Sequence, residues 1–326
     1  MLRYTLRVGL QYAFTLFVAI CLNFALPRLA PGNPIDFLLP PELAGALPPE
    51  QIQQVAAQFG LDKPVPEQFV AYLAGLARGD LLYSVRYGKP VALLLAERLP
   101  WTLLLVGTAI LLTSILGTAI GFWSAWRRGT AKDALALGGM MFLDSMPAFF
   151  VGMLLILLFS VKLGWLPIYG ALPDEDRVGL AQLIEMAKRM VMPLLTLVIG
   201  SLAPVYLVAR TALVSELRED YVLLAEAKGI GRAGVRRHAQ RNALLPLSTL
   251  ILLNIASMVG GASVVETVFS YPGLGRLIYE SVIARDYPTL QGAFLLLAVG
   301  VMFASILAEL VYSVIDPRIR RTGVVE

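Results

Sequence analysis

Long runs of residues without charge dominate the sequence. Six such runs occur, at positions 8–27, 99–126, 145–161, 190–209, 242–265 and 287–308. A helix of about 20 apolar residues crosses the roughly 30 Å hydrocarbon core of a bilayer. Only 15% of the 326 residues are charged, whereas a soluble domain carries about 25%. The pattern predicts an all-α membrane protein with six transmembrane helices and disfavours a large soluble enzyme with buried helices.

The distribution of positive charge predicts how the chain is oriented. Six spans place both termini on one side of the membrane. Lys and Arg number 15 in the 57 residues assigned to that side and 12 in the 120 residues assigned to the other. Because positively charged loops stay in the cytoplasm, we expect both termini and residues 210–241 to be cytoplasmic. The net charge of +4 follows from this asymmetry and does not indicate a nucleic-acid partner. The expected partner of the spans is the lipid bilayer.

The spans divide the chain into segments. We expect a first span with its cytoplasmic end, an extracytoplasmic helical insert, a five-helix transmembrane domain and a cytoplasmic tail, at residues 1–29, 30–96, 97–317 and 318–326. The first run is longer than a signal-peptide core and no clear cleavage site follows it, so we interpret it as a span.

The outer segments contain signals for short helices. In the insert, EQIQQVAAQFG predicts a helix that ends at Gly60. The stretch VPEQFVAYLAGLARGD predicts another, with Pro66 near its start and Gly79 near its end. Residues 180–188 predict a third helix, on the outer surface. The insert is too small to form a stable domain by itself.

Residues that usually carry catalysis or bind metal are scarce. The single cysteine, Cys21, lies in an apolar run, and the single histidine, His238, lies among arginines. No phosphate-binding G-x-x-x-x-G-K-[ST] loop and no G-x-S-x-G or H-E-x-x-H motif occurs. We therefore expect no enzyme activity, no catalytic residue, no metal site and no cofactor in this chain.

A polar block, DYVLLAEAKGIGRAGVRRHAQRNALLP, interrupts the apolar chain at residues 220–246. Ser215 is expected to cap a helix that Gly229 ends in a left-handed conformation. A second, basic helix is expected over residues 233–242, and Pro246 marks the entry into the next span. The block, which we take as a cytoplasmic loop over residues 215–246, exceeds the usual link of about 2–8 residues between helices. It is either a docking surface for a partner or an amphipathic loop on anionic lipid.

The same block resembles the coupling-loop signature of permeases from bacterial binding-protein-dependent ABC importers, in the dipeptide/oligopeptide version. Other stretches resemble this family in the same order along the chain: LPRLAPGNPID, ERLPWTLLL, SMPAFFVGMLL, VVETVFSYPGLGRLI and YSVIDPRIR. The chain departs from the general Glu-Ala-Ala pattern, because AEAKG places Glu226 between Ala225 and Ala227. The resemblance implies a type I ABC importer-like permease bundle in the bacterial cytoplasmic (inner) membrane.

The resemblance also implies a function and partners. The chain would form half of the translocation pathway for short peptides, and a second homologous permease would form the other half. An extracytoplasmic binding protein would deliver the solute, and two ABC ATPase subunits would bind ATP and Mg. The resemblance also admits nickel, glutathione, opines or oligosaccharides as alternative substrates. An ATP-independent channel, a secondary transporter and a non-transporting membrane scaffold are alternatives of other classes.

The resemblance assigns ATPase docking to the polar block. The residues expected to take part are Tyr221, Leu224, Ala225, Glu226, Ala227, Lys228, Gly229, Ile230, Arg237, His238 and Arg241. Gly229 suits the corner of this element, because a side chain there would need positive φ and would thicken the corner against the ATPase.

Charged and turn-forming residues in or near the spans are candidates for a gate or pathway, since charge in a membrane is costly and often functional. They are Asp144, Pro147, Glu266, Phe269, Pro272, Gly273 and Glu309. A kink at Pro147 is expected to expose Asp144. The alternative for the acidic residues is interhelical pairing, with Arg210 or Asn254 among the candidate partners. Asn23 and Asn254 are expected to form hydrogen bonds between helices.

Overall fold

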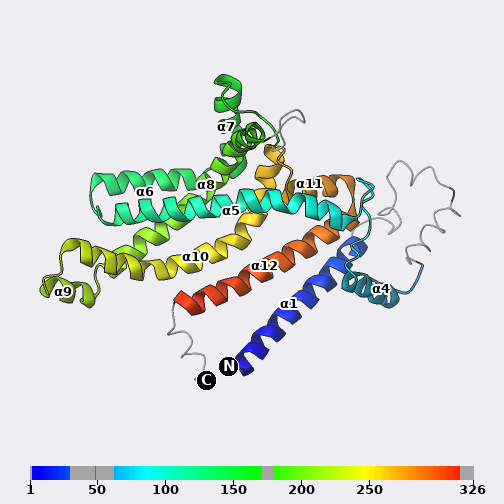
Figure 1. Ribbon diagram of the computed structural model, residues 1–326, viewed down its shortest axis with the longest axis horizontal. Helices are drawn as coiled ribbons and strands as arrows, with labels where there is room; N and C mark the ends of the chain where they lie inside the picture. Colours follow the sequence, from blue (N-terminus) through cyan, green and yellow to red (C-terminus); the bar gives the residue numbers. More distant parts are fainter. Residues whose placement is uncertain (1, 30–47, 49–61, 171–178, 316–326) are drawn as a thin grey trace. The chain divides into compact units, whose positions relative to one another are not determined.

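The computed structural model describes residues 2–29, 48, 62–170 and 179–315 (Figure 1). Within these ranges the chain is helical, with no strand beyond one isolated bridge between Tyr83 and Pro90. It divides into two compact units, one made of Met1–Pro100 and Arg276–Met302 and the other of Trp101–Gly275 and Phe303–Glu326. The short insert helix EQIQQVAAQFG lies outside the described residues.

Unit 1 combines the N-terminal helix with the outer segments. It contains α1 (Leu2–Leu29), α4 (Val65–Ala77), the start of α5 (Val91–Ala125), most of α11 (Leu274–Ala284) and the first part of α12 (Tyr287–Ile315). The Asn23 side chain donates to the Gln291 carbonyl at 2.7 Å, and the Gln291 amide donates back to the Asn23 carbonyl at 2.9 Å. Asn23 therefore forms a bond between α1 and α12, as predicted. The prediction for the Asn254 side chain lies outside the described part.

Unit 2 holds the remaining helices. They are the rest of α5, α6 (Ala131–Asp144), α7 (Ala148–Leu155), the π-helix η2 (Ile156–Lys162), α8 (Leu180–Glu216), α9 (Asp220–Ala227), α10 (Arg232–Val268) and the end of α12.

The helix α4 of unit 1 confirms the second helix predicted in the insert. It has Pro66 in its first turn and is followed by Gly79 at φ +76°.

The charge-free runs fall almost entirely in helices. Four helices of the described chain are long and apolar enough to cross a membrane, namely α1, α5, α8 and α12. The bent pair formed by α6 and α7–η2 makes a fifth if it crosses as one broken span. The remaining run, residues 242–265, lies within the continuous helix α10. The predicted class, a helical membrane protein, is confirmed.

The third span is broken at Pro147. The helix α6 ends at Asp144, α7 starts at Ala148, and the chain bends by 96° between them. Pro147 occupies the N-cap position of α7, because a proline cannot continue the hydrogen-bond ladder of the preceding helix. The expected kink is confirmed, and Asp144 is exposed beside it. The charge-free run at residues 145–161 begins at this break and continues through α7 and η2.

Two helices are longer than predicted. The separate surface helix at residues 180–188 was wrong, because α8 continues through it into the fourth run. The break after residue 242 was also wrong, since α10 continues through Pro246. The buried side chains of α10 recur at four-residue intervals through this proline: Val235, Ala239, Ala243 and Leu247. One packed stripe thus offsets the backbone hydrogen bond that the proline removes.

Ser215 is not an N-cap, contrary to the prediction. It lies in the last turn of α8, and α9 starts only at Asp220, with Glu219 at its N-cap and no capping side-chain bond. Leu213 is fully buried and packs with α5 and α10, so α8 stays helical to Glu216.

The helices α5 and α8 approach closely at two glycines. A Cβ atom on Gly117 would lie 2.7 Å from Val205, and one on Gly121 would lie 2.5 Å from Ala209. Glycines spaced four residues apart allow helix backbones in membranes to come this close. Next to this contact, α5, α8 and α10 share a buried apolar group, the base cluster: Phe122, Ala125, Val205, Ala209, Leu213, Ala239, Ala243 and Leu247. The base cluster fixes the first turns of α10 and therefore the position of α9.

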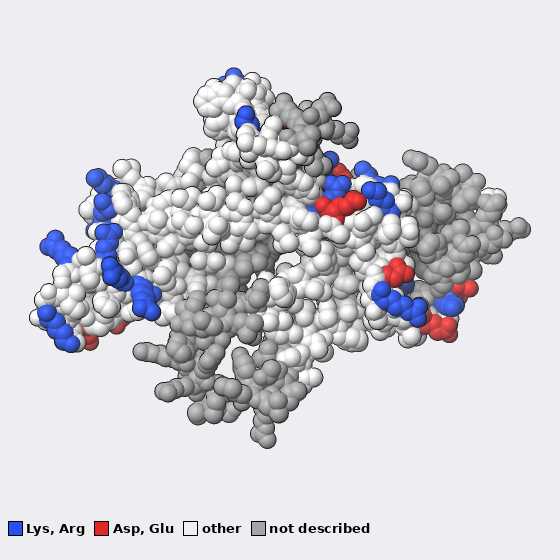
Figure 2. Space-filling view, viewed as in Figure 1, with Lys and Arg blue, Asp and Glu red and all other residues white. Residues whose placement is uncertain are grey.

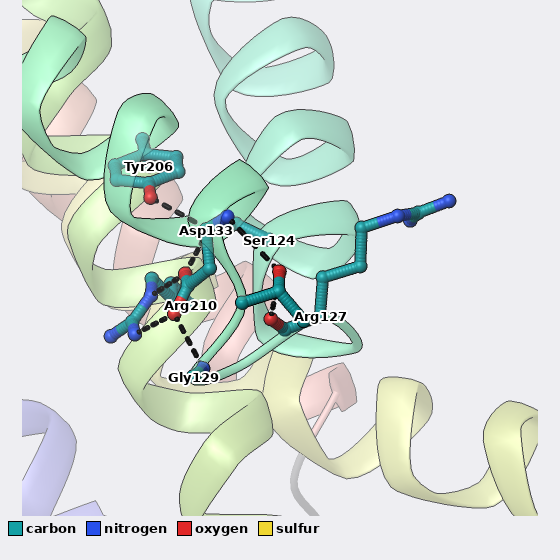
Figure 3. Close-up of polar contacts among 7 residues, drawn as sticks. Ser124, Arg127, Gly129, Asp133, Tyr206 and Arg210 are labelled. Atoms are coloured by element: carbon teal, nitrogen blue, oxygen red, sulfur yellow. Dashed lines mark hydrogen bonds and ion pairs between the residues drawn. The ribbon is translucent and has the colours of Figure 1, made fainter.

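A buried ion pair ties the α5–α6 turn to α8 (Figure 3). The Arg210 guanidinium donates from Nε and Nη2 to the two Asp133 carboxylate oxygens, each at 2.7 Å. Ser124 Oγ and the Gly129 amide also donate to this carboxylate, and Ser124 meets the Tyr206 hydroxyl at 2.8 Å. The side chains of Asp133 and Arg210 are only 6% and 17% exposed. The alternative in which Arg210 pairs with Asp144, Glu266 or Glu309 is therefore wrong, because the Arg210 guanidinium is bound to the Asp133 carboxylate.

A second buried network, the latch, lies at the other end of α10. Thr102 Oγ1 on α5 donates to Glu266 Oε1 at 2.7 Å and accepts from the Leu274 amide at 2.8 Å. Glu266 is fully buried, and a Cβ atom on Gly273 would lie 2.2 Å from its carboxyl carbon. The latch therefore fixes the turn between α10 and α11 against α5.

Replacing Asp133 by Asn should destabilise the protein strongly, because Arg210 would keep a buried charge without its anionic partner. We expect a loss of about 3–5 kcal/mol, seen as a lower apparent melting temperature in detergent. The exposed pair Lys89–Glu97, with side chains 50% and 44% exposed, supplies the control. Glu97→Gln should cost less than about 1 kcal/mol. Equal effects of the two substitutions would contradict the role given to the buried pair.

Replacing Thr102 by Val should release the latch, because the Leu274 amide and the Glu266 carboxylate each lose a buried partner while the side-chain volume stays the same. We expect a cost of about 1–3 kcal/mol, measured by thermal unfolding. Thr108→Val is the matched control on the same helix, since Thr108 bonds only its own helix through the Leu104 carbonyl at 2.7 Å. A Thr102 variant as stable as the Thr108 variant would show that the latch carries no stability.

Candidate functional site

The polar block folds into a helical corner with Gly229 at its apex. The helix α9 ends at Ala227, and Gly229 follows at φ +75°. The Gly229 amide donates to the Glu226 carbonyl at 2.9 Å, and the Ile230 amide donates to the Ala225 carbonyl at 3.1 Å. This pair of bonds is the Schellman arrangement that closes a helix end. The predicted left-handed glycine is confirmed, and we call residues 220–241 the α9–α10 corner.

The apex of the corner is open. No atom lies within 4 Å of the position that a Cβ atom on Gly229 would take. The chain itself therefore leaves room for a side chain there, and the restriction to glycine comes from the backbone conformation. The Cβ atom of a side chain added at this position would meet open space.

Polar bonds hold α9 against its neighbours. The Tyr221 hydroxyl donates to Glu216 at the end of α8 and also interacts with the Asn242 side chain on α10. Burial, together with the hydrogen bond to Glu216, raises the pKa of Tyr221 to about 12. The phenol thus stays protonated and remains a donor at neutral pH. Val222 on α9 and Val235 on α10 are buried beside these bonds.

The outer surface of the corner combines apolar and charged side chains. Leu223, Leu224 and Ile230 are 63%, 55% and 39% exposed. The acidic, basic and histidine side chains of the predicted docking set are all exposed: Glu226, Lys228, Arg237, His238 and Arg241. Ala227 is exposed and Ala225 half-buried. Apolar side chains surrounded by charge are typical of a protein interface. Leu223 extends this surface but was not among the residues predicted from the sequence. Its position next to Leu224 on α9 was the signal that could have identified it.

The space-filling view shows how charge is distributed around the corner. Lys and Arg side chains gather at the end of unit 2 where α9 and the α5–α6 turn lie, on the left of Figure 2. At that end of unit 2 few acidic atoms are visible, and they lie near α9. His238, expected as a loop residue if it had no role, lies in α10.

The candidate gate residues fall into separate places. Asp144 and Pro147 flank the α6–α7 break, while Glu266, Phe269, Pro272 and Gly273 belong to the buried turn around the latch. Phe269 is 2% exposed and packs against Gly152 on α7. Glu309 lies in α12, but its side chain is outside the described part. The latch residues thus form a packed junction between helices, rather than an open passage, in this conformation.

Within the described ranges, no group of three His, Cys, Asp or Glu side chains is placed to hold a metal ion. The α9–α10 corner combines exposed leucines, mixed charges and a glycine turn.

Comparison with known proteins extends these observations. Residues 117–321 match the family described as binding-protein-dependent transport system inner membrane component, and residues 1–106 match its N-terminal companion family. The chain is 36% identical to the glutathione transport system permease protein GsiC of Escherichia coli O6:H1 over 98% of this chain and 99% of the relative. It is 34% identical to the dipeptide transport system permease protein DppB of Escherichia coli K12, with the same coverage of both chains. A Brucella ovis protein named as a peptide permease is 37% identical over 99% of this chain and 100% of the relative.

A solved structure shares the fold. A chain of the methionine ABC transporter MetNI, in an inward-facing conformation, superposes with a TM-score of 0.55 and 16% identity. The match covers 68% of this chain and 96% of that one. The expected fold of an ABC importer permease is confirmed by this likeness. Together, the helical spans, the corner and the extent of the match lead to one conclusion: the chain belongs to the family of inner membrane components of binding-protein-dependent transport systems.

Proposed function

We propose that this protein is the permease subunit of an ATP-driven importer and forms half of a translocation pathway for short peptides. The observation that carries the proposal is its similarity, over nearly its whole length, to permeases named for dipeptides and for glutathione, itself a tripeptide. An extracytoplasmic binding protein delivers the peptide and a second, homologous permease completes the pathway. Glutathione itself, a nickel complex, an opine or an oligosaccharide is the alternative cargo.

The α9–α10 corner is the proposed attachment point for the ATPase. The chain contains no phosphate-binding loop of its own, so ATP and Mg would be bound, and ATP hydrolysed, by two partner subunits. The exposed leucines of α9 supply apolar contact, and the surrounding charges supply orientation. In this arrangement the termini and the corner face the cytoplasm, consistent with the distribution of Lys and Arg. Closure of the ATPases would move the corner and shift the permease pair between inward-open and outward-open states.

Reconstitution tests the proposed function directly. We expect uptake of a labelled dipeptide into proteoliposomes only when the second permease, the ATPase subunits, the binding protein and ATP are all present. Uptake without ATP would indicate a channel or a secondary transporter instead. ATP-dependent uptake of another solute, with no uptake of dipeptides or tripeptides, would keep the importer assignment and reject the peptide cargo.

Gly229→Asp should uncouple transport while leaving the protein in the membrane. The substitution forces a side chain into positive φ and adds bulk and negative charge at the open apex where the ATPase is proposed to dock. We expect ATP-dependent uptake to fall at least about tenfold, with an unchanged amount of protein in the membrane fraction.

Gly79→Asp is the matched control for this experiment. Gly79 ends α4 with the same pair of Schellman bonds, has φ +76° and has no atom within 4 Å of its Cβ position. The local backbone strain is therefore equal at the two sites, and only Gly229 lies in the proposed docking surface. Uptake close to wild type in the Gly229 variant, or an equal loss in both variants, would reject the docking assignment.

A further inference from the structure

The α5–α6 turn carries only positive charge at its surface. Arg128 and Lys132 are exposed, and Arg127 is partly exposed beside them. The one acidic residue of the turn, Asp133, is buried and held in the fork of Arg210 (Figure 3). The carboxylate therefore offers no charge to neutralise the surface cations, and this turn presents a net positive patch.

At this end of unit 2, two arginine side chains stack on the rings of two tryptophans. The Arg127 guanidinium carbon lies 4.5 Å from the centroid of the Trp123 ring, and that of Arg236 lies 5.1 Å from the Trp126 ring. Arg236 brings a fourth cation to the turn from α10, and it is the one residue that this patch shares with the α9–α10 corner. We call Trp123, Arg127, Arg128, Lys132 and Arg236 the basic collar. The stacking holds two of its guanidinium groups in fixed places, where each can present its N–H fork to an anion.

The collar adjoins exposed apolar helix surface. Leu116, Trp123 and Arg127 follow one another on one face of α5, at spacings of seven and four residues, and Leu116 is 42% and Trp123 38% exposed. Leu135 on α6, two residues after Asp133, is 76% exposed. Where a helix leaves the hydrocarbon and enters the headgroup layer, its side chains change in this order: apolar residues, then tryptophan, then arginine.

The collar differs in charge from the α9–α10 corner. The helix α9 and its approach contain four acidic residues, namely Glu216, Glu219, Asp220 and Glu226. Mixed charge suits a protein partner, whereas a purely basic patch at the edge of an apolar surface complements a layer of phosphates.

We propose that the basic collar binds the phosphate headgroups of anionic phospholipids, and so attaches the α5–α6 end of unit 2 to the membrane surface. The guanidinium groups of Arg127 and Arg236 and the Lys132 ammonium contact the phosphate oxygens, while Trp123 lies at the level of the headgroups. The choice of the cytoplasmic leaflet rests on the proposed function and its topology. Binding of anionic lipid by the collar does not.

Brominated lipids test the proposal, because bromine quenches the fluorescence of a tryptophan that it touches. The full-length chain is reconstituted in phosphatidylcholine vesicles that contain brominated phosphatidylglycerol or brominated phosphatidylcholine at equal mole fraction. Subtracting the signal of Trp123→Phe isolates Trp123. We expect stronger quenching by phosphatidylglycerol, and a preference reduced about tenfold or more in the triple variant Arg127→Gln, Arg128→Gln, Lys132→Gln.

The triple variant Lys63→Gln, Arg78→Gln, Arg86→Gln is the matched control. It removes the same charge from three exposed positions, and Arg86 also lies over an aromatic ring, that of Tyr87. The control should keep the full lipid preference at Trp123. Circular dichroism checks that both triple variants are folded. If the collar variant is not folded, single variants replace the two triple variants. Arg128→Gln must then lower the preference of Trp123 for phosphatidylglycerol more than Arg78→Gln does.

Several results would overturn the proposal. Equal quenching of Trp123 by the two lipids in the wild type would do so, as would a preference that survives in the collar variant. Loss of the preference in inorganic phosphate, but not in sodium chloride of the same ionic strength, would assign the collar to a free phosphate compound. A collar variant that keeps its lipid preference but no longer co-purifies with the ATPase subunits would make the collar a protein interface. The uptake assay decides the proposed function separately.

Discussion

The close contact between α5 and α8 at Gly117 and Gly121 is the interaction on which unit 2 depends. Because the two backbones almost touch there, Ser124 reaches Tyr206, and the turn after α5 brings Asp133 within reach of Arg210. The same contact sets the spacing of the base cluster, against which the first turns of α10 pack. The position of the α9–α10 corner thus follows from two glycines near the C-terminal end of the membrane helix α5. A larger side chain at either glycine would separate the helices and loosen everything beyond them.

Two kinds of polar bond stabilise an otherwise apolar unit, and they have different consequences. The Asp133–Arg210 pair lies where a helix returns through a tight turn, and it removes the one acidic charge that the turn would otherwise present. The latch of Thr102 and Glu266 lies where α10 gives way to α11, and it satisfies a buried backbone amide in addition to a carboxylate. Neither network contains an exposed acidic group. Both networks therefore fix how the helices of unit 2 pack. In the two proposals above, the ATPase and the lipid headgroups are bound by the exposed side chains of the corner and the collar.

Much of this organisation could be predicted from the sequence, and the errors have physical causes. Charge-free runs locate helices in a membrane protein because each run must satisfy its own backbone, and a glycine after a polar helix predicts a left-handed end, as found at Gly229. Helix boundaries were less predictable. Pro246 normally indicates a break, but the buried stripe of α10 continues past it to Leu247, and such packing depends on residues distant in sequence. The partner of Arg210 was missed for the same reason: Asp133 lies 77 positions away, and only the α5–α8 contact brings it close.

The continuity of α10 links the two ends of unit 2 in a mechanical sense. Its 37 residues form one continuous helix, whose path at 1.5 Å per residue is about 55 Å long. One end is the glycine corner and the other carries Glu266 and the latch. Because the helix is continuous, a displacement of its first turns is passed along its backbone toward the latch. Pro246 therefore matters less as an interruption of α10 than as a position through which such a displacement must pass. It lies between the end where nucleotide would act and the end where solute would enter.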